Sequence, residues 1–160
     1  MGHQITAVDN HKPFLETLTA QAKQEGILDR IHVQLGDMFS LEKILPTNTF
    51  DVIWSEGSIY IIGFKRGLTE WKHFLKSSYL VCSEVSWLSS SPPSEAQEFW
   101  SRNYPGMLSR EANIDLIKQC GYELVNSFVV PESAWEEYHR PMEKKIEELR
   151  GKYEGFFSDL

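Results

Sequence analysis

The stretch Phe50-Asp51-Val52-Ile53-Trp54-Ser55-Glu56-Gly57-Ser58-Ile59-Tyr60 decides the fold that we expect for this chain. Its apolar run, residues 52–54, stops abruptly at Ser55, Glu56 and Gly57, where small and charged residues replace hydrophobic ones. An open α/β sheet binds its ligands in the crevice beyond the carboxyl ends of buried parallel strands. The turn 55–57 is therefore expected to form the lip of a site, and an ordinary strand-to-loop junction is the alternative interpretation.

The segments before this strand alternate between strand and helix patterns. Residues 5–9 alternate as a strand that ends at Asp9, and residues 31–35 do the same before Gly36-Asp37-Met38. Between them, Pro13 suits the first turn of a helix that stops at Gly26, and a short helical turn follows at 41–45. This order predicts an α/β fold with a parallel sheet and right-handed crossovers.

The second half of the chain continues with helices and two more strands. The patterns predict a helix over 64–75, a strand over 79–85, a helix after a capping box of Ser94 and Gln97, and a helix over 110–120. A strand over 122–130 and a last helix, with a capping box of Ser133 and Glu136, complete the pattern. Two sets of residues are expected to be buried, a core set and the stripe of the last helix: Trp71, Phe74 and Phe99, and Met142, Ile146, Leu149 and Tyr153.

Composition limits the classes of partner. The 160 residues are 41% hydrophobic, which suits one compact domain, and the formal net charge is −7 with no dense cluster of Lys or Arg. This charge argues against nucleic-acid and anionic-membrane binding, which depend on phosphate neutralisation, and no apolar stretch has the length to span a bilayer. Cys82 and Cys120 lie in apolar runs without metal-ligand spacing, so we expect no metal and two reduced thiols in a cytoplasmic protein.

Three carboxylates follow the ends of predicted parallel strands: Asp9, Asp37 and Glu56. Because those ends face the same edge of a parallel sheet, we expect the three acids to converge on one crevice. A carboxylate in such a place can accept hydrogen bonds from the hydroxyls of a ribose. For each acid taken alone, a helix cap or turn former is the competing interpretation.

These blocks resemble a known family. Residues 5–10, Gly36-Asp37-Met38, residues 50–57 and residues 75–87 resemble the class I S-adenosylmethionine-dependent methyltransferases. Within that class the closest resemblance is to small-molecule enzymes similar to those of ubiquinone and menaquinone biosynthesis. The resemblance covers nearly the whole chain and implies an incomplete Rossmann-like sheet, mostly parallel, with helices on both faces. It also implies S-adenosyl-L-methionine as the cofactor and a small-molecule methyl acceptor as the substrate.

The resemblance also assigns roles to single residues. It implies that Asp9 holds the ribose with Asn10 beside it, and that Asp37 meets the adenine amino group while Met38 packs on the ring. The turn of Ser55, Glu56 and Gly57 would lie along the methionine moiety and the methyl group. Tyr60, Trp87 and Trp100 would form the wall of the acceptor pocket, and no general base is named.

The chain also departs from the family pattern. Family members carry a strand and a glycine-rich turn just before the segment that begins here at Gln4, and that strand lies between the strands that end here at Asp9 and Trp54. Three arrangements would close the gap: direct pairing of those two strands, a strand from a second copy in a homodimer that covers the edges, or a longer parent protein. We favour the last, a single domain over 1–160 truncated at its amino end, and the residues after 154 are also too few for the family's final strand.

The resulting functional hypothesis is methyl transfer from S-adenosyl-L-methionine to a small molecule, impaired in this chain alone. A non-catalytic methyltransferase-like partner subunit is the first alternative. A nicotinamide-dependent oxidoreductase is the second, because an acid after a second strand suits that cofactor as well.

Overall fold

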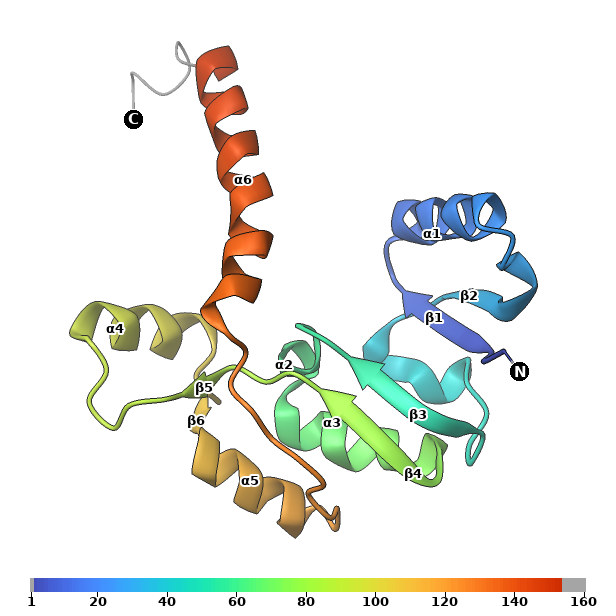
Figure 1. The fold of residues 1–160 in the computed structure, drawn as a ribbon. Coiled ribbons are helices and arrows are strands. Elements are labelled where there is room, and N and C mark those ends of the chain that lie inside the picture. Colours follow the sequence, from blue (N-terminus) through green and yellow to red (C-terminus); the bar gives the residue numbers. More distant parts are fainter. Residues whose placement is uncertain (1, 154–160) are drawn as a thin grey trace. The chain divides into compact units, whose positions relative to one another are not determined.

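The computed structural model describes residues 2–153 and divides the chain into two compact units, Met1–Glu123 and Leu124–Leu160. The first unit contains all the strands of the described part and five of the six α-helices. The second unit contains one helix, α6 (Figure 1). The segment 155–160, on which the sequence analysis made a prediction, lies outside the described residues.

The first unit begins with a β-α-β motif. Strand β1 (Ile5–Asp9) and strand β2 (Ile31–Leu35) pair in parallel, with Ile5 opposite Ile31 and Asp9 opposite Leu35. Between them lie helix α1 (Lys12–Gln24), which has the predicted Pro13 in its first turn, and the 3-10 turn η1 (Leu28–Arg30). Gly26 has a positive φ of 69°, a backbone conformation that favours glycine, and it follows the helix as predicted. These predictions from the strand and helix patterns are confirmed.

A second parallel pair carries the main hydrophobic core. Strand β3 (Phe50–Ser55) pairs with strand β4 (Leu75–Cys82), with Ser55 opposite Cys82. The connection between them folds into α2 (Ile59–Ile62), α3 (Phe64–Glu70) and the 3-10 turn η3 (Trp71–Phe74). Its side chains form the buried cluster, which consists of Ile59, Ile62, Phe64, Leu68, Trp71 and Phe74. The 3-10 segment η2 (Met38–Lys43), which links β2 to β3, packs against this cluster.

The two parallel pairs do not join into one sheet. Among the described residues β1 pairs only with β2, and β3 only with β4, so the direct pairing of β1 with β3 that the sequence analysis considered is not seen. Several strand side chains are exposed, among them Trp54 of β3, which is 69% accessible. The prediction of an α/β fold with parallel strands is confirmed, in the form of small separate sheets.

The rest of the first unit follows β4. Strands β5 (Ser86–Trp87) and β6 (Leu108–Ser109) form a short parallel pair, flanked by helices α4 (Ser94–Asn103) and α5 (Arg110–Gln119). The predicted capping box at Ser94 is wrong, because Ser94 already lies in the first turn of α4 and the residue at the N-cap is Pro93. A serine cap does occur on α5, where Ser109 Oγ accepts from the backbone N–H of Ala112 at 3.2 Å. Phe99, predicted as core, is 56% accessible on α4.

Three further predictions, for residues 122–153, are wrong. Residues 122–130 form no strand, and Phe128 is 77% accessible, because no neighbouring backbone pairs with this extended segment in the described part of the chain. Helix α6 (Glu132–Tyr153) forms, but its predicted buried stripe is exposed at Met142, Ile146, Leu149 and Tyr153. Among the described residues of this unit there is a single helix, so no second helix of the unit covers the stripe. Ser133 lies inside the helix, so the capping box predicted there is wrong.

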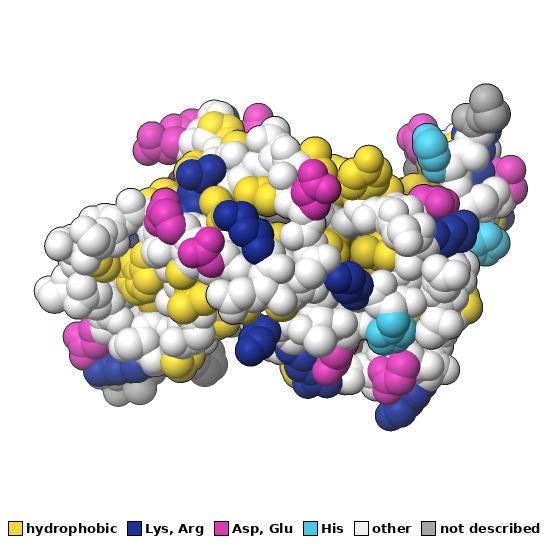
Figure 2. Space-filling model, turned by 90° about the horizontal axis from the view of Figure 1, so that it is seen from below, with side chains coloured by type: hydrophobic (Ala, Val, Ile, Leu, Met, Phe, Trp, Pro, Cys, Tyr) yellow, Lys and Arg dark blue, Asp and Glu magenta, His cyan; other side chains and the backbone are white. Residues whose placement is uncertain are grey.

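Surface charge is mixed on the face that Figure 2 draws. Lys and Arg side chains are interspersed there with Asp and Glu, and hydrophobic side chains lie between them. Several charges are paired along helices, such as Lys12 with Glu16 and Arg66 with Glu70. Among the described residues we find no helix with the length and apolarity that crossing a bilayer requires.

Candidate functional site

The expected cofactor residues lie at the carboxyl ends of the parallel strands. Asp9 ends β1, Asp37 follows β2 by two residues, and Ser55 ends β3. The arrows of β1, β3 and β4 point the same way in Figure 1, and β2 is parallel to β1. The strand ends that carry these residues therefore face one direction within the first unit.

Asp9 and Asp37 each use one carboxylate oxygen for the local backbone. Oδ1 of Asp9 accepts from the N–H of His11 at 2.6 Å, and Oδ1 of Asp37 accepts from the N–H of Phe39 at 2.9 Å, as the N-cap of η2. Both acids therefore bond to the local backbone, as the alternative interpretation of a helix cap or turn former expected. In the described part of the chain neither Oδ2 has a hydrogen-bond partner, so each acid has one carboxylate oxygen that is not bonded locally. Asn10, beside Asp9, is exposed.

The turn after β3 is tied to the end of β4. Ser83 donates its backbone N–H to the Ser55 carbonyl at 3.0 Å, and its Oγ accepts from the N–H of Gly57 at 2.7 Å. Ser55 is buried, and its Oγ hydrogen-bonds to Oγ of Ser58 at 2.8 Å. Gly57 has a φ of 60°, in the left-handed region that glycine adopts without strain. The predicted lip of the site is therefore a fixed turn, with the exposed carboxylate of Glu56 at its outside.

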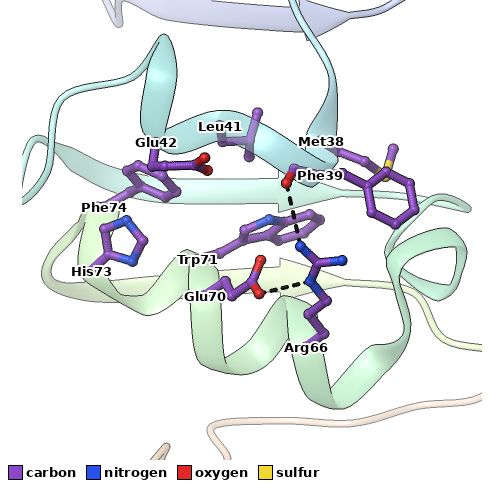
Figure 3. A pocket seen from close by; sticks show the side chains of 9 residues that line it. All are labelled: Met38, Phe39, Leu41, Glu42, Arg66, Glu70, Trp71, His73 and Phe74. Carbon is purple, nitrogen blue, oxygen red and sulfur yellow. Dashed lines mark hydrogen bonds and ion pairs between the residues drawn. The ribbon is translucent and has the colours of Figure 1, made fainter.

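Met38 lies in a different setting from the exposed acids. It lines a hollow of about 250 Å³ between η2 and the helical connection α3–η3, together with Phe39, Glu42 and Arg66 among others (Figure 3). Arg66 bonds there to Glu70 at 2.7 Å and to the Phe39 carbonyl at 3.4 Å. Met38 also packs against the buried cluster, so in this structure it supports the core next to the strand ends.

A second pocket contains two of the three expected acceptor residues. Trp87 of β5 and Trp100 of α4 line a pocket of about 420 Å³, which we call the tryptophan pocket. Its other aromatic wall is Tyr104, just after α4, and the remaining lining residues are neutral: Ser89, Ser90, Pro92, Gln97, Ser101, Pro105, Met107 and Ser109. Tyr60 does not line it, but its ring contacts the ring of Tyr104 edge to face, with centroids 5.8 Å apart. The structure thus brings the three predicted residues to one neighbourhood.

Glu84 follows the end of β4 and contacts Tyr104, one of the residues that line the tryptophan pocket. It lies two residues past β4, next to Ser83, and its Oε1 accepts from the Tyr104 hydroxyl at 2.7 Å. Burial raises the pKa of Glu84 to about 7, although the Tyr104 hydrogen bond acts in the opposite direction. Two residues after Glu84, Ser86 Oγ accepts a hydrogen bond from Nδ2 of Asn113 at 2.9 Å. Cys82 also has a pKa raised by burial, to about 11, so its thiol is neutral near pH 7.

Neither Glu84 nor Tyr104 is among the candidate site residues predicted from the sequence. Glu84 follows a strand end and could have been found by the reasoning applied to Asp9 and Glu56, but the strand was predicted to run to residue 85, whereas β4 ends at Cys82. Tyr104 shows no signal of its own in the sequence. Within residues 2–153 we find no group of three or more His, Cys, Asp or Glu side chains that could hold a metal ion.

Comparison with known proteins now identifies the family. Residues 1–82 match the family described as methyltransferase domain. Because this range is more than half of the chain, the chain belongs to that family. All seven residues expected at the cofactor lie within the matched range, and the family implies S-adenosyl-L-methionine as the cofactor. A comparison with curated proteins gives no match.

Solved structures with the same fold support this assignment. A SAM-dependent methyltransferase from Geobacter sulfurreducens, in complex with S-adenosyl-L-homocysteine, is 16% identical, with a TM-score of 0.76 over 92% of this chain and 59% of that one. A candidate sarcosine dimethylglycine methyltransferase from Galdieria sulphuraria is 19% identical, with a TM-score of 0.60 over 96% of this chain and 57% of that one. The cyclase SpnF is 20% identical, with a TM-score of 0.60 over 78% of this chain and 44% of that one.

These likenesses define the fold as that of class I S-adenosylmethionine-dependent methyltransferases. The chain spans 44 to 59% of the length of these three structures.

Proposed function

We propose that this chain is the cofactor-binding and acceptor-binding part of an enzyme that methylates a small molecule. The observation that carries the proposal is that the family match over residues 1–82 contains every strand end at which cofactor residues were expected. The bound cofactor would supply a methyl group activated by its sulfonium. The chain's own residues would then align the acceptor, exclude water and take up the proton that the acceptor loses.

The site residues divide into two sets in this proposal. Asp9, with Asn10, would hold the ribose through its spare carboxylate oxygen, and Asp37 would meet the adenine, with Met38 at the ring. The turn of Ser55, Glu56 and Gly57 would lie along the methionine part, where the bond from Gly57 to Ser83 keeps its shape. Tyr60, Trp87 and Trp100 would enclose the acceptor.

We consider two chemical classes of methyl acceptor, ring compounds and amines. The resemblance to enzymes of ubiquinone and menaquinone biosynthesis favours a ring compound of that kind. The Galdieria protein is named for sarcosine and dimethylglycine, which are amines, and its structure covers 96% of this chain. We also propose that the chain works in the cytoplasm, in line with the unbonded thiols of Cys82 and Cys120.

The chain on its own should bind the cofactor weakly. We propose that residues 1–160 form one truncated domain, and that a further strand fits between β1 and β3, because both strands have only one paired side in the described residues. The strand would come from a longer parent chain or from a second copy in a homodimer. Sedimentation equilibrium separates these sources, since a stable dimer assigns the strand to a second copy and a monomer assigns it to the parent.

A titration with S-adenosyl-L-homocysteine followed by amide NMR tests the cofactor site. We expect saturable shifts at Asp9, Asp37 and Gly57 with a dissociation constant well above the micromolar range. Asp9→Ala should weaken binding about tenfold or more, because a hydrogen bond to a charged group contributes about 1.5 to 3 kcal/mol. Asp51→Ala is the matched control, because Asp51 lies near the amino end of β3, away from the strand ends, and its exposed carboxylate pairs with Lys76.

Three results would contradict the proposal in different ways. Micromolar affinity would refute the impairment. Absence of shifts at all three residues would favour the non-catalytic partner subunit, and shifts produced by a nicotinamide dinucleotide but not by S-adenosyl-L-homocysteine would favour the oxidoreductase.

A further inference from the structure

When Glu84 is ionised, it carries a negative charge that nothing in the described part of the chain neutralises. Its side chain is half-buried, and its Oε1 has a single partner, the Tyr104 hydroxyl. Its Oε2 is buried and has no hydrogen-bond partner, and no ion pair of the described residues includes it. Burying a carboxylate without a cation is unfavourable, which is the cause of its raised pKa. The environment of Glu84 therefore lacks a positive charge.

The tryptophan pocket offers a place for that charge. Three of its lining residues, Trp87, Trp100 and Tyr104, are aromatic, and the electron-rich faces of aromatic rings attract organic cations. Tyr104 belongs to both features, because its ring lines the pocket while its hydroxyl donates to Glu84. A phenol that donates to a carboxylate has a more electron-rich ring, so Glu84 strengthens the attraction of this wall for a cation.

The lining of the pocket argues against other ligand charges. None of the residues that line it is Lys or Arg, so an anionic ligand would have no counter-charge and would be repelled by Glu84. A neutral ligand would leave Glu84 uncompensated. The serine hydroxyls of the lining, such as Ser101 and Ser109, can accept the N–H groups of a protonated amine.

We propose that the tryptophan pocket binds a small organic ammonium group, with Glu84 behind Tyr104 as the fixed counter-charge. The binding itself follows from the pocket and from Glu84. Only the role of this ligand as the methyl acceptor rests on the proposed function, and in that role it places the enzyme among those that act on amines.

A pair of probes of equal shape tests the proposal. tert-Butylammonium and tert-butanol differ by a charge, and both can be titrated into the chain at pH 8, where Glu84 is ionised and the Cys82 thiol is neutral. The indole N–H signals of the five tryptophans report on the site. We expect saturable shifts of Trp87 and Trp100 with tert-butylammonium, and at least tenfold weaker binding of tert-butanol.

Two variants assign the effect to Glu84. Glu84→Gln removes the charge and should weaken tert-butylammonium binding about tenfold, the order of a charge interaction across one aromatic ring near a protein surface. Glu98→Gln is the matched control, because Glu98 lies on α4, which also carries Trp100, but is exposed and paired with Arg102. Tyr104→Phe keeps the ring and removes the hydroxyl. Its affinity for tert-butylammonium should lie between that of the wild-type chain and that of Glu84→Gln.

The outcomes are distinct. Equal binding of the two probes, or no shift of Trp87 and Trp100 with either, would overturn the proposal even if Glu84→Gln failed to fold. Shifts with tert-butylammonium but none with S-adenosyl-L-homocysteine would support the ammonium site and count against the proposed function. Shifts with S-adenosyl-L-homocysteine but none with tert-butylammonium would support the proposed function and overturn the ammonium site.

Discussion

Replacing Glu84 by Gln should make the chain more stable at pH 8, and this stabilisation should be several-fold smaller at pH 5. The pKa of Glu84 is raised from 4.5 to about 7 in the folded chain, so the folded chain binds this proton more tightly than the unfolded chain does. The free energy of unfolding must then fall as the pH rises from about 4.5 to about 7, and this contribution is flat above that range. Gln resembles the protonated carboxyl and removes this dependence.

The size of the effect follows from the same shift. One pKa unit corresponds to about 1.4 kcal/mol, so the full shift would give about 3 kcal/mol. Because the side chain is only half-buried, solvent screens part of this interaction, and we expect about 1 to 2 kcal/mol. The loss of the charge should outweigh any weakening of the bond to Tyr104, since that hydroxyl can also donate to the Gln oxygen.

Urea unfolding of the wild-type chain and of Glu84→Gln at pH 5 and pH 8 measures this difference. Other carboxylates titrate equally in both proteins and cancel in the comparison. Glu123→Gln, a change at an exposed residue of the first unit, is the control and should show no pH-dependent difference. If the stabilisation by Glu84→Gln were the same at both pH values, the attribution of the shift to burial of this carboxylate would be refuted.

Three further substitutions test the core and the strand ends. Phe74→Ala should destabilise the chain by about 3 to 5 kcal/mol in urea unfolding, because Phe74 is only 2% accessible within the buried cluster; a loss as small as that of Phe99→Ala, at an exposed position, would contradict this. Ser83→Ala removes the acceptor of the Gly57 N–H and should cost about 1 to 2 kcal/mol, with NMR shifts confined to the 55–57 turn, and an unchanged Gly57 amide would argue against the tie. Asp37→Ala should cost about 1 kcal/mol through the lost cap of η2, and a neutral result would mean that the cap does not hold this segment.

Local patterns were sufficient to predict most elements of the first unit. The alternation in residues 5–9 and 31–35 and the apolar run before Ser55 predicted β1, β2 and β3, because each strand needs only its own side-chain sequence to be recognised. Residues 122–130 have the same kind of sequence but form no strand, since a strand also needs a neighbouring backbone, which the local sequence does not reveal.

The sequence predicted those candidate site residues that lie at the ends of recognisable strands. Asp9, Asp37 and Ser55 were found because each stands after a recognisable strand. Glu84 was missed because the end of β4 was placed three residues too late, and Tyr104 because its position depends on the fold of the segment after α4. The contact between Tyr104 and Glu84 joins residues 20 apart, and no periodicity in the sequence marks it.

Within the described residues β1 and β3 each pair with one neighbouring strand, and this has a measurable consequence for their backbone amides. In a parallel strand alternate residues direct their N–H groups to opposite sides, so a strand with one neighbour has every second amide bonded and the next one open to solvent. Deuterium uptake along β1 and β3 would then alternate between slow and fast from one residue to the next. Filling the open side would turn this alternation into uniform protection, residue by residue.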